Sequence, residues 1–194
     1  GQDADDFACG TGMNALAEKY HCLVAYPEQS CGANGAKCWN WFQPGDQTRD
    51  RGEPAIIAGL VREIMATHAV DPERIYVAGM SAGGAMAVIL GRTHPELFAA
   101  VGVHSGLPYR VAHDMPSAFV AMQRRCAQKA RLARDESQSA PPRTIPTIVF
   151  HGDRDTTVHP GNGDQVAAEA ASADTASTDA SSATAERRHG TTPL

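Results

Sequence analysis

The chain has 194 residues, of which 42% are hydrophobic, 20% charged and 6% aromatic, and its formal net charge is −5. This composition supplies enough apolar residues for a hydrophobic core, and it excludes a collagen, a coiled coil and a wholly disordered chain. The mild acidity gives no sign of binding to nucleic acid or to an anionic membrane. No apolar run approaches the roughly 18 residues that a transmembrane helix needs.

The first third of the chain predicts a helix, a strand and a second helix. Residues 5–20 carry apolar side chains at helical spacing, although Gly10 and Gly12 weaken the first half of this helix. Residues 23–28, with the sequence LVAYPE, form a short apolar run that predicts a buried strand. Residues 54–68 predict a helix whose apolar face consists of Ile56, Ile57, Leu60, Val61, Ile64 and Met65.

The middle of the chain alternates predicted strands and helices. The runs RIYVAG, FAAVGVHSG and IPTIVFHG read as apolar strands. The run AGGAMAVILGRTHP, which starts at Ala82, reads as a helix that ends before Pro95. Residues 107–144 form an insert with one helix near 117–134. Continuously apolar strands that alternate with helices predict an α/β protein with a mostly parallel sheet covered on both faces. Its functional loops should lie at the carboxyl ends of the strands.

The composition changes near residue 166. From Ala167 to Pro193 the chain contains no Val, Ile, Leu, Met, Phe, Tyr or Trp. A segment of this kind cannot bury enough side chain to offset the entropy lost on ordering. We therefore predict a partial domain over residues 1–166 and a disordered or weakly helical low-complexity tail over residues 167–194.

A G-x-S-x-G motif, Gly79-Met80-Ser81-Ala82-Gly83, lies between a predicted strand and the helix that follows. A nucleophile on so tight a turn is held in strained backbone geometry, and glycines on either side give the turn room. The motif predicts Ser81 as a nucleophile and the Ala82 amide as an oxyanion donor at the positive end of the helix. The alternative is that Ser81 serves only as the N-cap of a closely packed helix.

A serine nucleophile needs a base, and the base needs a carboxylate that orients it. The strand IPTIVFHG is followed by two candidate carboxylates, Asp153 and Asp155. Asp153 could simply cap the turn at Gly152, whereas Asp155 lies deeper in the loop and precedes Val158, which can anchor the loop on the core. The spacing of the motif favours Asp155 as the acid.

Four runs of the sequence together resemble the poly(3-hydroxyalkanoate) depolymerase family of esterases, which is related to feruloyl and acetylxylan esterases and has the α/β-hydrolase fold. They are CWNWFQPGDQTRDRGEP, YVAGMSAGGAMA, VGVHSGLP and IVFHGDRDTTVHPGNGD, and the resemblance covers residues 3–166. It implies a secreted serine hydrolase that cleaves carboxylic esters of the 3-hydroxybutyrate type through an acyl-enzyme on Ser81. The same resemblance implies Asp155 as the acid and the Ala82 amide as an oxyanion donor, with no cofactor and no metal. An esterase for feruloyl or acetyl groups is the alternative within this class.

The resemblance also suggests that Trp39 and Trp41 border the substrate site, although an aromatic pair in a loop serves equally often as cover for the core. Two family features have no match: the His-Gly loop that donates the second oxyanion amide, and the strand-borne histidine near the carboxyl end. We therefore expect the fold to be incomplete at both ends. A catalytically incomplete chain or a non-enzymatic relic is the rival hypothesis.

Eight histidines are present, but only His159 and His189 follow the acid loop. His159 is too near Asp155 in the same loop to reach Ser81 naturally, and no apolar strand precedes His189 to hold it in place. His189 is thus a weak candidate for the base. We expect the histidines that close strands, His104 and His151, to bond nearby backbone, and we expect the remaining ones on the surface: His21, His68, His94 and His113.

The five cysteines show no C-x-x-C spacing, which argues against a zinc site. Cys31 and Cys38 flank a short loop that could close as a disulfide in an oxidising compartment. The alternative is a pair of unbonded thiols. The others are Cys9, Cys22 and Cys126.

Overall fold

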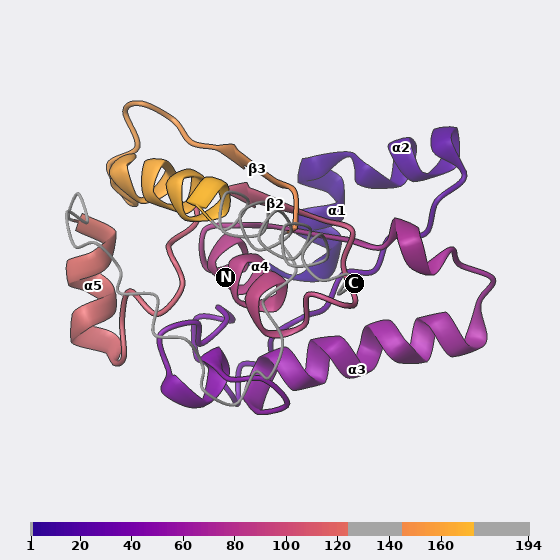
Figure 1. The fold of residues 1–194 in the computed structure, drawn as a ribbon, viewed down its shortest axis with the longest axis horizontal. Coiled ribbons are helices and arrows are strands. Elements are labelled where there is room, and N and C mark those ends of the chain that lie inside the picture. Colours follow the sequence, from indigo (N-terminus) through magenta and orange to yellow (C-terminus); the bar gives the residue numbers. More distant parts are fainter. Residues whose placement is uncertain (1, 124–144, 173–194) are drawn as a thin grey trace, which may run out of the picture. The chain divides into compact units, whose positions relative to one another are not determined.

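A computed structural model describes residues 2–123 and 145–172 of the chain (Figure 1). The chain divides into two compact units, Gly1–Asn40 and Trp41–Leu194. Of the tail predicted over 167–194, only residues 167–172 are described, and they continue a helix that begins at residue 161. The domain limits expected from the composition stay a prediction.

The first unit contains two short helices where the sequence predicts one. α1 spans Ala4–Thr11 and α2 spans Met13–Tyr20. The break falls at Gly12, whose φ of 63° lies in the left-handed region that glycine adopts without steric cost. The Asp3 carboxylate caps the start of α1 by accepting a hydrogen bond from the Asp6 amide at 2.9 Å. The weak point predicted at the glycines is thus a complete break.

The strand predicted at residues 23–28 is wrong. This segment has no strand assignment, and Leu23 is 62% exposed. An apolar run becomes a strand only when a neighbouring strand pairs with its backbone, and the described residues of this unit include no strand. Tyr26 instead packs edge-to-face on Phe7, with ring centroids 6.5 Å apart, and its hydroxyl donates to Asn14 at 2.9 Å.

The second unit is built on a parallel sheet. Its strands are β1 (Tyr76–Met80), β2 (Ala100–His104) and β3 (Thr147–Phe150), in the spatial order β1-β2-β3. In register, Met80 pairs with His104 and His104 pairs with Phe150. All three strands therefore end at the same edge of the sheet. The predicted α/β class and the parallel pairing are confirmed.

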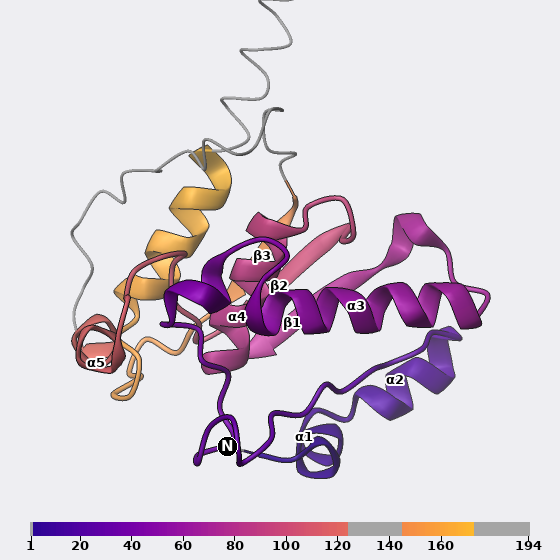
Figure 2. The same cartoon turned by 90° about the horizontal axis from the view of Figure 1, so that it is seen from below.

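Three α-helices of this unit are bounded within the described residues: α3 (Gly52–Thr67), α4 (Ala82–Thr93) and α5 (Met115–Gln123). Two 3-10 helices span Pro44–Gln47 and Pro72–Arg74. α4 packs against β1 and β2 (Figure 2). It is buried almost all round, which fits its unbroken apolar sequence; the buried side chains include Ala85, Met86, Ala87, Val88, Ile89 and Leu90.

The predicted apolar face of α3 is only partly buried. Ile57 and Ala58 lie in the core, whereas Ile56 is 70% exposed and Leu60 is also exposed. Helical spacing gives the direction of a face but not its width, because the width depends on which neighbours cover it.

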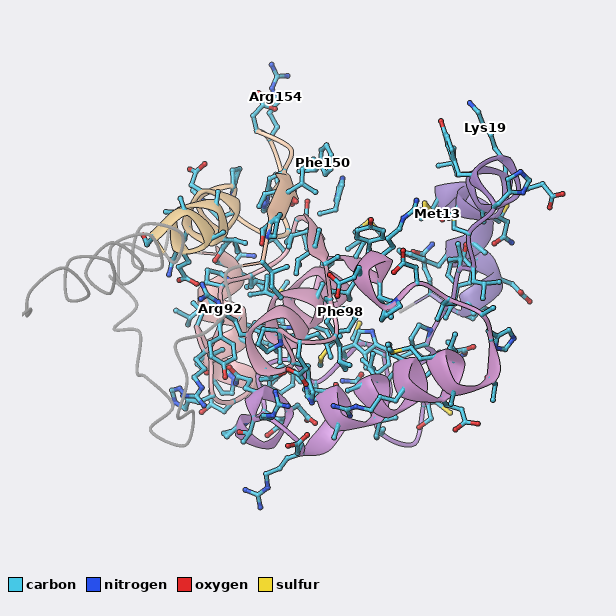
Figure 3. All side chains as sticks on the ribbon, turned by 45° about the vertical axis from the view of Figure 1, so that its right-hand side comes forward. Met13, Lys19, Arg92, Phe98, Phe150 and Arg154 are labelled. Carbon is cyan, nitrogen blue, oxygen red and sulfur yellow. The ribbon has the colours of Figure 1, made fainter. Side chains whose placement is uncertain are left out.

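One face of the sheet carries exposed apolar side chains. Tyr76, Met80, Ile148 and Phe150 alternate with inward-facing residues along β1 and β3 and are all exposed. Phe150 stands out from the ribbon of β3 in Figure 3. The expected helix cover over this second face of the sheet stays a prediction.

His94, at the carboxyl end of α4, is fully buried, so the expectation that it lies on the surface is wrong. The Thr93 hydroxyl donates to the Ile89 carbonyl at 2.8 Å and lies 2.9 Å from His94 Nδ1. His94 Nε2 lies 3.4 Å from Asp50 Oδ1. Burial, followed by the nearby Arg49 charge, lowers the pKa of His94.

His21, His68 and His113 are exposed as expected. Among the helices of residues 2–123 and 145–172, none is long and apolar enough to cross a membrane. The same residues contain no group of three or more His, Cys, Asp or Glu side chains placed to hold a metal ion.

Candidate active site

Ser81 occupies a strained turn between β1 and α4. Its backbone has φ 55° and ψ −119°, a region that residues with a Cβ rarely adopt. The Ser81 amide donates to the His104 carbonyl at 2.9 Å, which ties the turn to the end of β2. The Ser81 carbonyl accepts from the Ala85 amide at 3.0 Å and so begins the helix. The backbone of Ser81 is therefore fixed on both sides.

The glycines of the motif have different roles. A Cβ added at Gly79 would collide with the backbone carbonyl of Gly83, whereas a Cβ at Gly83 would meet nothing within 4 Å. A second close approach brings Gly84 and Gly106 together, since a Cβ on Gly84 would lie 3.0 Å from the Gly106 Cα. The expectation that both outer glycines make room is thus half right: Gly79 has no space for a Cβ, whereas Gly83 has open space where a Cβ would lie.

The Ser81 side chain does not act as an N-cap. Ser81 stands at the N-cap position of α4, but its hydroxyl makes no capping hydrogen bond. This geometry argues against the alternative in which Ser81 only starts a helix. Ala82 is the first residue of α4, so its N–H has no acceptor within the helix and lies at the positive end of the helix dipole. A half-buried serine whose hydroxyl does not cap the helix therefore lies next to an amide suited to an oxyanion.

The acid loop, residues 151–158, leaves the same edge of the sheet after β3. Asp155 Oδ1 accepts hydrogen bonds from the amides of Thr157 at 2.9 Å and Val158 at 3.0 Å. Val158 is buried, as expected for the residue that anchors this loop. Asp153 is exposed, and Arg154 points away from the tip of the loop (Figure 3). Of the two carboxylates, Asp155 is thus the one held by the fold.

The Asp155 carboxylate is stabilised in its charged form. The hydrogen bond from the Val158 amide lowers the pKa of Asp155 most. Burial opposes this effect, and the Thr157 amide, the Ser105 side chain and the nearby His151 lower the pKa further. Ser105 lies directly after β2 and was not singled out in the sequence. Its position one residue before Gly106, at the end of a predicted strand, was the signal available.

His151 holds the two ends of the acid loop together. Its Nε2 lies 2.8 Å from the Val158 carbonyl, which can only accept, so Nε2 carries the proton. The same nitrogen lies 3.5 Å from Asp155 Oδ2. The expectation that His151 bonds nearby backbone is confirmed. Nδ1 of His151 is buried and has no hydrogen-bond partner among the described residues.

Within residues 2–123 and 145–172, no histidine ring is hydrogen-bonded to the Ser81 hydroxyl. His159 Nδ1 accepts from the Gly161 amide at 3.0 Å, and the His159 amide donates to the Met122 carbonyl at 2.8 Å. These bonds give His159 a structural role at the start of the helix from residue 161. His189 lies outside the described residues. The identity of the base therefore stays a prediction.

Trp39 belongs to the first compact unit and Trp41 to the second. Trp41 is buried and packs edge-to-face on Phe42, with ring centroids 5.7 Å apart. This is the geometry of a core contact. Trp39 is half-buried in the first unit. A role for either ring in substrate binding stays a prediction. The thiols of Cys9, Cys22 and Cys31 are free, so the structure contains no disulfide between Cys31 and Cys38, and Cys126 lies outside the described residues.

Comparison with known proteins shows which family the chain belongs to. The family model for esterase PHB depolymerase matches residues 1–193. Poly(3-hydroxyalkanoate) depolymerase C of Paucimonas lemoignei is 39% identical over 158 residues, which are 78% of this chain and 38% of that protein. The probable acetylxylan esterase A of Aspergillus fumigatus is 28% identical over 169 residues, 82% of this chain and 45% of that protein.

The fold also has a solved counterpart. The acetyl xylan esterase from Aspergillus awamori superposes with a TM-score of 0.56 at 21% identity, over 76% of this chain and 57% of that chain. This likeness confirms the α/β-hydrolase type of fold predicted from the sequence. The chain spans less than half the length of the two curated relatives. By the match of its whole length to the family model, the chain belongs to the esterase PHB depolymerase family.

Proposed function

We propose that this chain carries the nucleophile and the acid of a serine hydrolase that cleaves carboxylic esters. The observation that carries the proposal is the backbone of Ser81, which is held at φ 55° and ψ −119° while its hydroxyl caps nothing. Strain of this kind persists only where the surrounding structure enforces it, and it is a recurrent property of active sites. Asp155, half-buried and with a lowered carboxyl pKa, lies in the loop that leaves the same edge of the sheet.

The reaction follows from these groups. Ser81 Oγ attacks the ester carbonyl carbon, its proton passes through a histidine to the departing alcohol, and the acyl group remains on Ser81. Water then attacks the acyl-enzyme, the carboxylic acid leaves, and the proton returns to Ser81. Asp155 orients the histidine and stabilises its charged form, and the Ala82 amide donates to the oxyanion. His189 is the candidate base that follows the acid loop in the chain.

The substrate class we favour is a polyester of 3-hydroxy acids, such as poly(3-hydroxybutyrate). It is supported by the higher identity to the depolymerase, 39%, than to the acetylxylan esterase, 28%. An acetyl or feruloyl ester of a polysaccharide is the second candidate, supported by the likeness in sequence and in fold to the two acetylxylan esterases. Secretion is proposed together with a polymeric substrate, which cannot enter a cell intact.

The test compares three substrates with one matched pair of proteins. The protein and its Ser81→Ala variant are assayed on p-nitrophenyl butyrate, on a 3-hydroxybutyrate trimer and on acetylated xylan. We expect turnover of the first two, lost by on the order of 10⁴-fold or more in the variant. Equal turnover by both proteins would contradict the role of Ser81. Preference for acetylated xylan would favour the second substrate class, and a folded protein without turnover would favour the non-enzymatic alternative.

A further inference from the structure

His151 is a buried histidine that the proposed reaction does not use. It follows directly after β3, at the start of the acid loop, and its side chain is 7% exposed. Its Nε2 lies 2.8 Å from the Val158 carbonyl at the far end of the loop and 3.5 Å from Asp155 Oδ2. One ring nitrogen therefore lies close both to the backbone that closes the loop and to the carboxylate of the candidate acid.

The contacts among His151, Asp155 and Val158 form a closed circuit. Val158 donates its amide to Asp155 Oδ1 at 3.0 Å, and its carbonyl accepts the proton of His151 Nε2 at 2.8 Å. The Thr157 amide also donates to Oδ1, at 2.9 Å. Oδ2 receives neither amide bond and is the oxygen that lies 3.5 Å from the imidazole. The amides thus fix one carboxylate oxygen, and the ring limits where the other can turn.

The other edge of the His151 ring lies against Gly163. A Cβ built on Gly163 would lie 2.7 Å from His151 Nδ1 and 3.0 Å from His151 Cβ, so a larger residue there would displace the ring or the helix. Gly163 is buried in the first turn of the helix that begins at residue 161. The ring therefore touches this helix with its Nδ1 edge and the acid loop with Nε2.

Catalysis makes a specific demand on one oxygen of the acid. In a serine hydrolase the carboxylate accepts the N–H of the catalytic histidine, fixes its tautomer and stabilises its charged form. Since both amides bond Asp155 Oδ1, Oδ2 is the oxygen that can accept this N–H while the amide bonds are kept. An error of about 1 Å in the position of a catalytic group can cost about 100-fold in rate. The direction of Oδ2 therefore matters, and the His151 ring lies beside it.

We propose that His151 is a positioning residue whose ring directs Asp155 Oδ2 toward the catalytic histidine. The Val158 carbonyl and Gly163 hold the ring in place for this role. His151 is distinct from the base itself, because its Nε2 donates to the Val158 carbonyl and its Nδ1 is covered by Gly163. The effect on catalysis rests on the proposed function, whereas the arrangement of the loop is open to measurement whether or not the protein hydrolyses esters.

The experiment compares two substitutions of His151 with one of Gly163. His151→Phe keeps a flat ring but removes the donor to Val158, whereas His151→Gln keeps a donor of similar reach. Gly163→Ala leaves His151 and Asp155 in the chain but places a methyl group against the ring. kcat and KM are measured on p-nitrophenyl butyrate as a function of pH. Proton NMR follows the Thr157 and Val158 amides through the titration of Asp155, a readout that needs no activity.

We expect His151→Phe and Gly163→Ala to lower kcat by about 10- to 100-fold with little change in KM, and His151→Gln to lose less than about fivefold. The acid limb of kcat/KM should move to lower pH in the two impaired variants, because a carboxylate that faces the catalytic histidine less well raises its pKa less. The amide signals of residues 157 and 158 should follow the titration of Asp155 in the unsubstituted protein and follow it less in these variants.

The matched control is Gly59→Ala. Gly59 is an exposed glycine of α3, and a Cβ added there would meet nothing within 4 Å, so its replacement should leave kcat and the acid limb unchanged.

Unchanged kcat in the folded His151→Phe variant would overturn the proposal, and so would an equal loss in His151→Phe and His151→Gln. A lower kcat with an unmoved acid limb and unmoved amide signals would show a merely structural role and would overturn it too. If His151→Phe does not fold, Gly163→Ala against Gly59→Ala decides by the same measurements. If the unsubstituted protein has no esterase activity, the proposed function fails separately, and the amide signals alone test the arrangement.

Discussion

The nucleophile turn, residues 79–84, and the acid loop, residues 151–158, lie at the same edge of one sheet but are held by different forces. The turn is fixed by steric exclusion: Gly79 has no room for a Cβ, and the Ser81 backbone is strained. The acid loop is fixed by polar contacts, namely the Thr157 and Val158 amides on Asp155 and the Val158 carbonyl on His151. Only the first kind of constraint demands particular residues at particular spacings. The turn can therefore be recognised from a short motif, whereas the polar contacts of the loop are made by backbone groups that every residue carries.

The largest difference within the acid loop should separate its two carboxylates. Asp155→Asn is expected to reduce kcat by about 10³- to 10⁴-fold, because a neutral amide favours the wrong histidine tautomer and cannot stabilise its charged form. Asp153→Asn is the matched control: Asp153 is exposed, and its replacement should leave kcat within about twofold. Steady-state kinetics on p-nitrophenyl butyrate decide the matter, and equal effects of the two substitutions would refute the assignment.

Steric control of the turn predicts opposite effects for the two outer glycines of one motif. Gly79→Ala should lower the free energy of unfolding by about 3–5 kcal/mol or prevent folding, because the new Cβ collides with the Gly83 carbonyl. Gly83→Ala should raise it by about 0.5–1 kcal/mol, since Gly83 lies in α4 with open space around it and alanine favours the helix. Urea unfolding of both variants provides the measurement. Similar losses in the two would mean that the turn is not limited by Gly79.

The other end of α4 offers a pH-dependent contrast. The pKa of His94 is lowered in the folded state, so the unfolded chain binds more protons at mildly acidic pH. The stability that neutral His94 allows is complete above its unfolded pKa of about 6.5 and is lost as the pH falls below it. Thermal unfolding between pH 8 and pH 5 should show this loss, and His94→Gln should make the slope shallower. His113→Gln, at an exposed site, should leave the slope unchanged. An equal change of slope in both variants would show that the buried His94 is not the source of the pH dependence.

The smallest expected effect concerns the strain at Ser81. Ser81→Gly and Ser81→Ala both remove the hydroxyl, but glycine also relieves the positive φ, so it should be about 1 kcal/mol more stable than the alanine variant. Comparison of their urea midpoints measures the difference. A glycine variant that is clearly less stable than the alanine variant would show that the turn is not strained.

The sequence predicted much of the second unit because its elements have strong local signals. The three strands and the helix after Ser81 were each marked by apolar runs bounded by turn residues, and the structure confirms them within a few residues. The strand at residues 23–28 was wrong because pairing depends on a neighbour that the run itself does not specify. The burial of His94 was missed because it follows from packing at the end of α4, and a single histidine has no pattern.

Within the site, the sequence identified the candidate catalytic residues better than the groups that hold them in position. Ser81 and Asp155 were placed by motif spacing, and their geometry fits those roles. The bonds from the Thr157 and Val158 amides to Asp155 could not be predicted, because every residue carries such a group and the motif does not show which of them face the carboxylate. The role of Gly83 was misread for a related reason: the motif shows that a glycine is present but not whether a side chain there would meet a neighbour.

The central claim is that Ser81 is an activated nucleophile. A fluorophosphonate reacts with such a serine and leaves a covalent phosphonyl adduct that peptide mass spectrometry can place. The account predicts one adduct, on the peptide that contains Ser81, absent from Ser81→Ala and formed much more slowly in Asp155→Asn than in Asp153→Asn. An unlabelled Ser81 in the folded protein, or labelling of another residue that persists in Ser81→Ala, would contradict it.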